Sequence, residues 1–178
     1  LSHTAQHITP EMASLTEYEI RAYDGCAATS EEADAILKLL DKYGPHYRNH
    51  FAPDMAARLA LILSADDGTD DFFETFDTLW RTADVGEQVI FYRGLPLYKN
   101  PARYEWRATD GCRTNIKGVF EAIAHRNPYP AEHFDEVAFN QLCLKALFVG
   151  SNLHRIQRLD SRHNGALARM MTDYAFER

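Results

Sequence analysis

The chain has 178 residues, of which 26 are acidic and 19 are basic, so its formal net charge is −7. A chain of this length fits a single domain, and its negative charge argues against a nucleic-acid-binding protein, which would present a basic surface. A hydrophobic content of 46% with 25% charged residues also excludes collagen, low-complexity disorder and a small disulfide-stapled protein.

Apolar residues recur at helical spacing through the first 108 residues. We expect five helices in this part of the chain, at residues 29–44, 53–65, 72–80, 84–95 and 101–108. Thr29 or Ser30 supplies a side-chain oxygen suited to capping the first helix, and Asp84 does the same for the fourth. Pro53 suits the first turn of the second helix, where its missing N–H is not needed.

Three further helices are predicted in the remainder, at residues 110–125, 135–149 and 164–178. Pro128 and Pro130 end the first of them, because a proline disfavours helical backbone at the residue before it. Gly150 ends the second, which is apolar on most sides. That distribution indicates a central helix covered on several faces.

No segment alternates apolar and polar residues in the manner of a strand. Short helices joined by short loops are typical of helical hairpins. The sequence therefore predicts an all-α protein with a single domain over residues 1–178, built as a superhelical, HEAT-like array of short antiparallel helix pairs. Within it we distinguish an acidic helical part, residues 1–80, from residues 81–178.

The charge is unevenly distributed along the chain. Residues 1–86 carry a net charge of −10 and residues 87–178 a net charge of +3, and 14 of the 19 basic residues are arginine. Arginine suits bidentate contact with carboxylates and phosphates. Two interpretations stay open: the two halves attract each other, or the C-terminal half holds a site for an anionic ligand.

Three cysteines, Cys26, Cys112 and Cys143, are too few and too scattered for a disulfide framework or a zinc knuckle. Free thiols in apolar segments indicate a reducing compartment, so we expect a cytoplasmic protein. No apolar run approaches the roughly 20 residues that span a bilayer, so the chain is not expected to cross a membrane itself. No stretch is recognisable as a secretory signal peptide.

Residues 107–164 hold more Asn, His and Arg than helix surfaces usually carry. Asn115 and Asn140 fall within predicted helices, where Asn is unfavourable, so each needs a structural hydrogen bond or a ligand. Glu121, His125 and His133 are weak metal candidates, because two of them share a helix face but the spacing matches no established metal motif. The alternative is that His125 caps the end of its helix. We expect neither a bound metal nor another cofactor.

General acid–base catalysis needs only two titratable groups in one pocket. The candidates for such a role are Glu121, His125, His133 and Asp135. Nucleophilic catalysis has less support, because no nucleophile-elbow motif is present and the cysteines lie in apolar surroundings.

Several segments of the second half resemble the EboA family. They are Arg81–Val85, Tyr92–Leu97, Gly111–Asn115, Phe120–Pro130, His133–Glu136 and Leu144–Gly150. The resemblance is ungapped over about residues 80–178, which makes it more specific than a short motif. It implies a component of a conserved gene cluster that makes or exports a secondary metabolite, including precursors of cyanobacterial sunscreens. The neighbouring proteins resemble a membrane prenyltransferase and a cyclitol-forming cyclase, and the resemblance brings no catalytic residues with it.

The family-like segments coincide with the polar region. We therefore expect any ligand site to lie there, with an anionic or polyhydroxylated small molecule as the ligand. The predicted ligand-binding residues are Arg113, Asn115, Asn127, Asn140, Lys145 and His154. The favoured function is a non-catalytic helical adaptor or small-molecule binder, whose partners include proteins of the same pathway such as the membrane prenyltransferase. The alternative is an enzyme that acts on a cyclitol or prenyl-phosphate intermediate by acid–base or metal-assisted chemistry.

Overall fold

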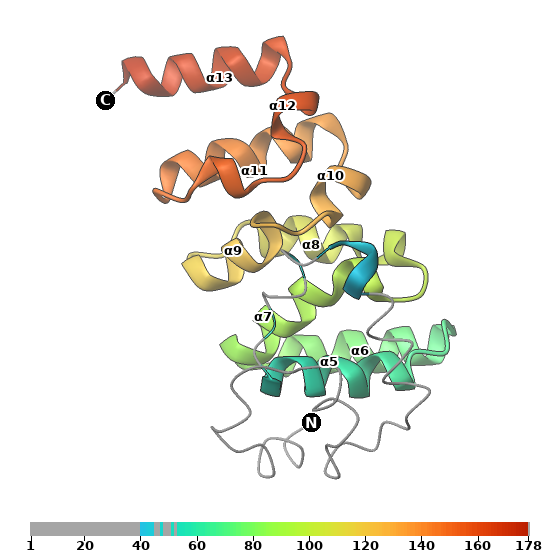
Figure 1. The fold of residues 1–178 in the computed structure, drawn as a ribbon. Coiled ribbons are helices and arrows are strands. Elements are labelled where there is room, and N and C mark those ends of the chain that lie inside the picture. The colour runs from blue at the N-terminus through green and yellow to red at the C-terminus, as the bar shows by residue number, and fades with distance from the viewer. Residues whose placement is uncertain (1–39, 45–46, 48–50, 52, 178) are drawn as a thin grey trace. The chain divides into compact units, whose positions relative to one another are not determined.

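The computed structural model describes residues 40–44, 47, 51 and 53–177. Every regular element among these residues is a helix, which confirms the all-α prediction (Figure 1). The β pairing in the described part is a single bridge between His125 and Ile156. Cys26 and most of the helix predicted at residues 29–44 lie outside the described residues, where only Leu40–Lys42 of that helix is seen as helical.

The chain divides into two compact units, Leu1–Asn100 and Pro101–Arg178, and each is described by itself. The boundary at residue 80, where the sequence changes character, falls inside helix α6 (Asp70–Thr82). The single domain and the HEAT-like superhelix remain predictions. In the described ranges, no helix combines the length and the apolar character that crossing a membrane requires.

The first unit is built on α5 (Pro53–Ala65), α6, α7 (Val85–Gly94) and the 3₁₀ turn η1 (Leu95–Leu97). Helix α7 packs against both α5 and α6. Thr69 caps α6 by accepting the Phe72 N–H, at 3.2 Å. Asp84 caps α7 in a capping box with Glu87, as its position before an apolar run predicted.

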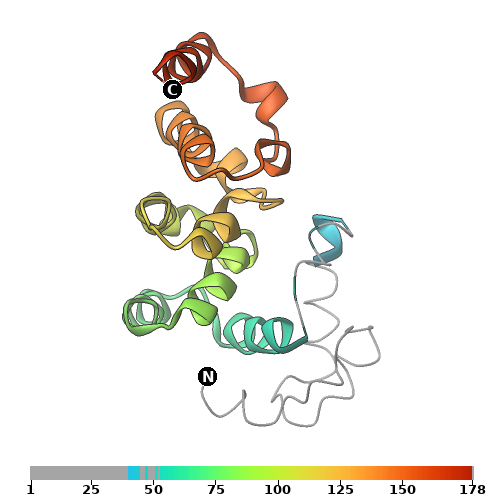
Figure 2. The same ribbon diagram turned by 90° about the vertical axis from the view of Figure 1, so that its left-hand side faces the viewer.

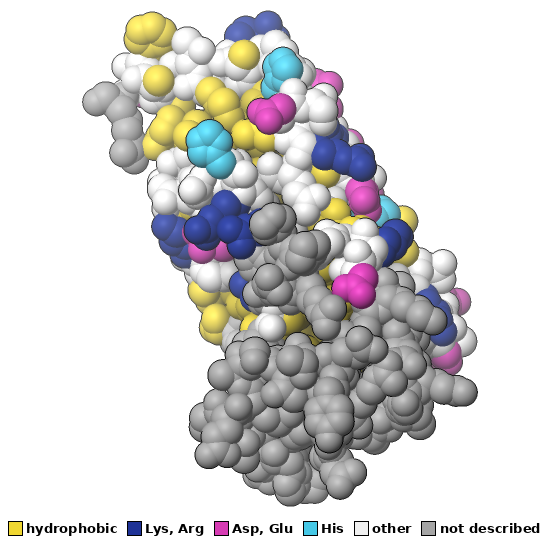
Figure 3. Space-filling model, in the orientation of Figure 1, with side chains coloured by type: hydrophobic (Ala, Val, Ile, Leu, Met, Phe, Trp, Pro, Cys, Tyr) yellow, Lys and Arg dark blue, Asp and Glu magenta, His cyan; other side chains and the backbone are white. Residues whose placement is uncertain are grey.

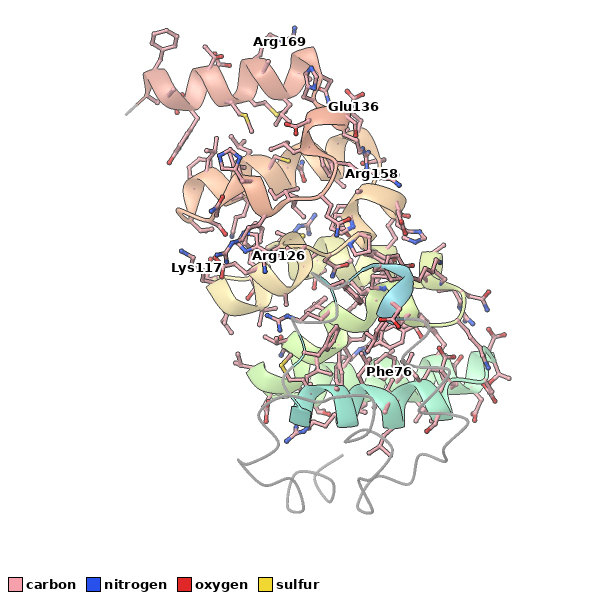
Figure 4. The ribbon with its side chains drawn as sticks, in the orientation of Figure 1. Phe76, Lys117, Arg126, Glu136, Arg158 and Arg169 are labelled. Atoms are coloured by element: carbon pink, nitrogen blue, oxygen red, sulfur yellow. The ribbon has the colours of Figure 1, made fainter. Side chains whose placement is uncertain are left out.

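Aromatic side chains fill the core of this unit. Phe76, which is labelled in Figure 4, lies with its ring centroid 5.1 Å from those of Trp80, Phe91 and Tyr98. Phe76 and Trp80 of α6 therefore belong to the core. Gly94 lies against this cluster, and a Cβ added there would come within 2.5 Å of the Tyr98 hydroxyl oxygen.

The second unit alternates 3₁₀ turns and short helices with longer helices. In chain order its elements are η2 (Pro101–Tyr104), α8 (Glu105–Gly111), α9 (Lys117–Ala124), α10 (Tyr129–His133), α11 (Glu136–Phe148), η3 (Leu153–Arg155), α12 (Leu159–Arg162) and α13 (Gly165–Phe176). Both views of the ribbon show α13 lying along α11, against which it packs (Figures 1 and 2).

The prediction of one helix over residues 110–125 is wrong. Helix α8 ends at Gly111, and α9 begins only at Lys117. Between them the Thr114 hydroxyl oxygen accepts the Ile116 N–H at 3.1 Å, a side-chain bond that competes with helical backbone. Asn115 is exposed in this turn, so the prediction that it lies within a helix is wrong.

Helix α11 follows the prediction more closely. Asp135 caps it by accepting the Ala138 N–H at 2.7 Å, and its buried side includes Phe139, Leu142, Cys143 and Ala146. The expectation that it is covered on several faces needs correction at two positions. Val137 is 61% exposed and Phe148 is 56% exposed, so one side of the helix faces solvent.

Arg162 connects α12 to the end of α10. Its guanidinium donates to the carbonyl oxygens of Pro130, Ala131 and Phe134 at 3.0, 3.1 and 2.9 Å. The same guanidinium lies 4.3 Å from the centroid of the Phe139 ring. Arg162 thus supplies donors to carbonyls at the end of a short helix, and the Pro130 carbonyl also accepts the Phe134 N–H.

Candidate functional site

A cavity of about 270 Å³ lies between the end of α8 and one face of α11, and we call it the α8–α11 pocket. Its lining residues come from three places in the second unit: Thr109, Cys112 and Arg113 at the end of α8 and in the following turn, Phe134 before α11, and Ala138, Gln141, Leu142 and Lys145 on α11.

The polar part of the lining is cationic. Arg113 is exposed at the rim and Lys145 is half-buried, while none of the eight lining residues is acidic. In the part of the chain that the structure describes, neither cation has an ion pair or a side-chain hydrogen bond. The pocket therefore presents two positive charges whose donors are available to a ligand.

The other part of the lining is apolar. Phe134 and Leu142 are buried, Ala138 is half-buried, and the Cys112 thiol lies beside them. Burial raises the pKa of Cys112 to about 12, and the nearby Lys145 charge lowers it only in part. The thiol is therefore neutral near pH 7 and inert as a nucleophile.

The sequence of α11 explains why the pocket has a cationic side and an apolar side. Gln141 and Lys145 are four residues apart and form one row on the helix surface, while Ala138 and Leu142 form the adjacent row. Both rows face the cavity, because all four residues line it. The N-cap at Asp135 fixes where the helix starts, and burial of Phe139, Cys143 and Ala146 sets which rows are left to face the cavity.

A second polar cluster joins α9 to the loop after α11. The Ser151 hydroxyl oxygen lies 2.9 Å from Glu121 Oε1 and 2.9 Å from His125 Nε2. The hydroxyl carries one proton, which it donates to the Glu121 carboxylate, so the His125 ring donates its Nε2–H to the serine oxygen. Lys117 Nζ lies 3.9 Å from the same carboxylate oxygen and donates to the Gly150 carbonyl at 3.0 Å.

Electrostatics supports a neutral His125. Burial lowers its pKa most strongly, Glu121 raises it, and the charges of Arg155, Arg126 and Lys117 lower it further. Figure 4 labels Lys117, the first residue of α9, and Arg126, which follows its last turn. Because Nε2 is the donor toward Ser151, this nitrogen does not take the serine proton. None of Glu121, His125 and Ser151 lines the α8–α11 pocket. Their hydrogen bonds connect α9 to the loop after α11.

The other predicted acid–base candidates lie elsewhere. The His133 ring stacks on Tyr129 with centroids 4.4 Å apart, and Asp135 is the N-cap of α11. Among the described residues no group of three or more His, Cys, Asp or Glu side chains is placed to hold a metal ion. Glu121, His125 and His133 are therefore not gathered around one ion.

The predicted amide and histidine ligands also separate. Asn127 is buried, donating to the Ala122 carbonyl at 3.0 Å and accepting the Tyr129 N–H at 3.0 Å, so its role is structural. Asn140 pairs with Asn164, and His154 is exposed in η3. Of the six predicted ligand-binding residues, only Arg113 and Lys145 line the α8–α11 pocket.

Several residues of these sites were absent from the predicted set. They are Thr109, Cys112, Gln141 and Ser151. The spacing of four between Gln141 and Lys145 was a usable signal for Gln141, because it places both on one helix face. No local signal pointed to Ser151, whose partners lie 26 and 30 residues away in the sequence.

Apolar side chains are exposed near the end of the second unit. The largest are Val137 and Phe148 on α11 and Met170 and Phe176 on α13. Yellow surface gathers over these helices in the upper part of Figure 3. A separate cavity of about 350 Å³ lies at the start of α13 and is lined mainly by aliphatic side chains such as Leu159, Leu167 and Met171. This surface has no charged row comparable to that of the α8–α11 pocket.

Comparison with known proteins gives one match. The family model described as "Metabolite traffic protein EboA" matches residues 21–178. The match includes both units and begins about 60 residues before the stretch that carries the resemblance in the sequence. No curated protein and no solved structure matches the chain.

Proposed function

Because the chain belongs to the EboA family of metabolite traffic proteins, we propose that it is a non-catalytic binder that holds an anionic or polyhydroxylated small molecule in the α8–α11 pocket. The observation that carries this proposal is the pair Arg113 and Lys145, which line one cavity together with no acidic neighbour in its lining. Like charges in a partly enclosed site repel each other, and a bound anion would relieve that repulsion.

The chemistry of the lining supports binding rather than catalysis. It contains no imidazole and no carboxylate, and its thiol has its pKa raised to about 12. A general acid–base mechanism needs a group that exchanges protons near neutral pH within reach of the ligand. The eight lining residues include no histidine, aspartate or glutamate to take that role.

The alternative function is an enzyme that acts on a cyclitol or prenyl-phosphate intermediate. One observation favours it: Glu121, Ser151 and His125 are in direct hydrogen-bond contact. In that case Ser151→Ala would abolish the production of the pathway's metabolite in the host, although it removes only a hydroxyl. For a binder of the kind proposed, the same substitution leaves production intact as long as the protein folds.

We place this binder in the cytoplasm, in a pathway of the prenyl-cyclitol or sunscreen-precursor type. There it would keep a pathway intermediate in solution and pass it to partner proteins, including a membrane prenyltransferase. A carrier needs a site that recognises its ligand without transforming it, which is the property that the lining of the α8–α11 pocket supports.

Native mass spectrometry of the protein purified from its own host tests the proposal. We expect a bound small molecule on the wild type and on Arg169→Ala, which removes an exposed cation on α13 outside the pocket. We expect its loss from the double variant Arg113→Ala/Lys145→Ala. A double variant that retains the same bound mass and full pathway output would overturn the proposal.

A further inference from the structure

The two rows of α11 point to a narrower class of ligand. Resting on the proposed function, we infer that the α8–α11 pocket takes an organic anion with an apolar body: a phosphate or carboxylate headgroup between Arg113 and Lys145, and a small hydrophobic portion against Phe134, Ala138 and Leu142. An uncharged polyol could also accept hydrogen bonds from the two cations. It does not fit the rest of this lining.

Hydrogen-bond capacity separates the two classes. Arginine and lysine side chains are donors only, and every hydroxyl of a polyol carries a proton that needs an acceptor. The lining has no carboxylate, and Thr109 already donates its hydroxyl proton to the Trp106 carbonyl at 2.9 Å. Side-chain acceptors are therefore limited to Gln141 and the Thr109 oxygen. A phosphate or carboxylate accepts from both cations and demands no acceptor in return.

Apolar contact supplies the second half of the recognition. Phe134 and Leu142 are 4% and 1% exposed, so their position in the wall is fixed by the core behind them. The neutral Cys112 thiol adds to this side as a small hydrophobic group. A polyol against this surface would lose water from its hydroxyls without replacement bonds, which is unfavourable.

The volume of the cavity limits the size of the ligand's apolar portion. Its volume of about 270 Å³ lies just below the roughly 300–1,000 Å³ that is usual for small-molecule sites. It therefore has room for a headgroup with one ring or a short branched chain, and not for a dinucleotide or a long lipid. The arrangement of charge at the rim and apolar wall within suits such a compact amphiphile.

Calorimetric titration of the full-length protein with four probes tests the inference. The probes are phenyl phosphate, benzoate, inorganic phosphate and myo-inositol. We expect the two aromatic anions to bind, phenyl phosphate about tenfold or more tightly than inorganic phosphate because the ring is buried, and myo-inositol to give no heat of binding. A comparison of the affinities for benzoate and phenyl phosphate shows whether the pocket prefers a carboxylate or a phosphate headgroup.

Two variants test the contacts of the ligand's headgroup and of its apolar portion separately. Gln141→Glu places a carboxylate in the row of Lys145 and should weaken both aromatic anions about tenfold or more. Ala138→Leu fills the apolar row, so phenyl phosphate should fall to the affinity of inorganic phosphate, which stays unchanged. Arg169→Ala should match the wild type throughout, and circular dichroism confirms that each variant is folded.

The outcomes also distinguish this inference from the proposed function. Binding of myo-inositol that depends on Arg113 and Lys145, without binding of phenyl phosphate, overturns the ligand class and leaves the proposed function standing. Equal affinities for phenyl phosphate and inorganic phosphate overturn the apolar contact. Absence of binding by all four probes overturns the inferred class, and the proposed function fails as well when the host-purified protein carries no bound molecule.

Discussion

The side-chain amides of Asn140 and Asn164 exchange two hydrogen bonds across the gap between α11 and α13. Asn140 Nδ2 donates to Asn164 Oδ1 at 3.2 Å, and Asn164 Nδ2 donates to Asn140 Oδ1 at 3.0 Å. Asn164 Oδ1 also accepts the Leu167 N–H at 2.9 Å and so caps α13. One residue thus starts a helix and attaches it to its neighbour, which explains an asparagine in the interior of α11.

Replacing Asn140 by Ala should therefore destabilise the second unit. The Asn164 amide would lose both a donor and an acceptor partner in a part-buried place, at a cost of about 1–3 kcal/mol. The free energy of unfolding in urea measures the loss. Asn115→Ala is the matched control, because Asn115 is exposed in the turn before α9, and it should change stability by less than about 0.5 kcal/mol. Equal effects of the two substitutions would show that the amide pair is not a stabilising contact.

Gly94 and Gly118 make a second matched pair. A Cβ on Gly94 would lie 2.5 Å from the Tyr98 hydroxyl oxygen and 2.6 Å from Leu59 Cδ1, whereas one on Gly118 meets nothing within 4 Å. Gly94→Ala should thus destabilise the protein by about 1–3 kcal/mol through overpacking. Gly118→Ala, within α9, should stabilise it by up to about 1 kcal/mol. Thermal unfolding of both variants checks the opposite signs, and a stabilised Gly94→Ala variant would refute the close packing at this glycine.

His125 predicts a pH dependence of stability. Burial lowers its pKa below the ordinary value of 6.5, so the unfolded chain binds the proton more readily than the folded one. Its contribution is then complete above about pH 6.5 and is lost as the pH falls below that value. His125→Gln keeps an N–H near Ser151 but cannot titrate. The difference in unfolding free energy between wild type and His125→Gln, measured in urea, should shrink on going from pH 8 to pH 5.5. Parallel curves for wild type and His125→Gln would contradict the buried neutral imidazole.

The Cys112 thiol offers a direct probe of the pocket. With its pKa raised to about 12, the thiolate fraction at pH 7.5 is very small, and labelling by iodoacetamide should be slow. The rate should rise about tenfold per pH unit up to pH 10, and saturating phenyl phosphate should reduce it at each pH. Peptide mass spectrometry assigns the modified cysteine. A rate that levels off near pH 8.5 would indicate an ordinary exposed thiol instead.

The helix ends that rest on local signals were predictable from the sequence. Asp84 and Asp135 precede apolar runs and cap the helices that were expected after them. The break between α8 and α9 was missed because Cys112 and Ile116 continue the apolar spacing across a turn. Gly111, Thr114 and Asn115 mark the turn, but a single glycine is compatible with a continuing helix, and Asn115 was interpreted as a residue that needs a hydrogen bond or a ligand.

The candidate sites required information that local patterns do not carry. Arg113 and Lys145 are 32 positions apart in the sequence, and their shared cavity depends on how α8 packs against α11. The same holds for Ser151, which binds residues of α9 from the loop after α11. Composition located the polar region, and tertiary packing decided which of its members meet. Asn127 and Asn140 were predicted in the same way, and the structure shows both making hydrogen bonds to other parts of the second unit.

The hydrogen bond from Arg162 to the Phe134 carbonyl affects how the α8–α11 pocket binds a ligand. Phe134 forms part of the apolar wall, and its backbone is held from behind by a guanidinium that also holds Pro130 and Ala131. Such a wall is set in place before a ligand arrives, so little conformational entropy is lost on association. The proposed ligand would therefore bind through few contacts in a site that does not have to rearrange around it.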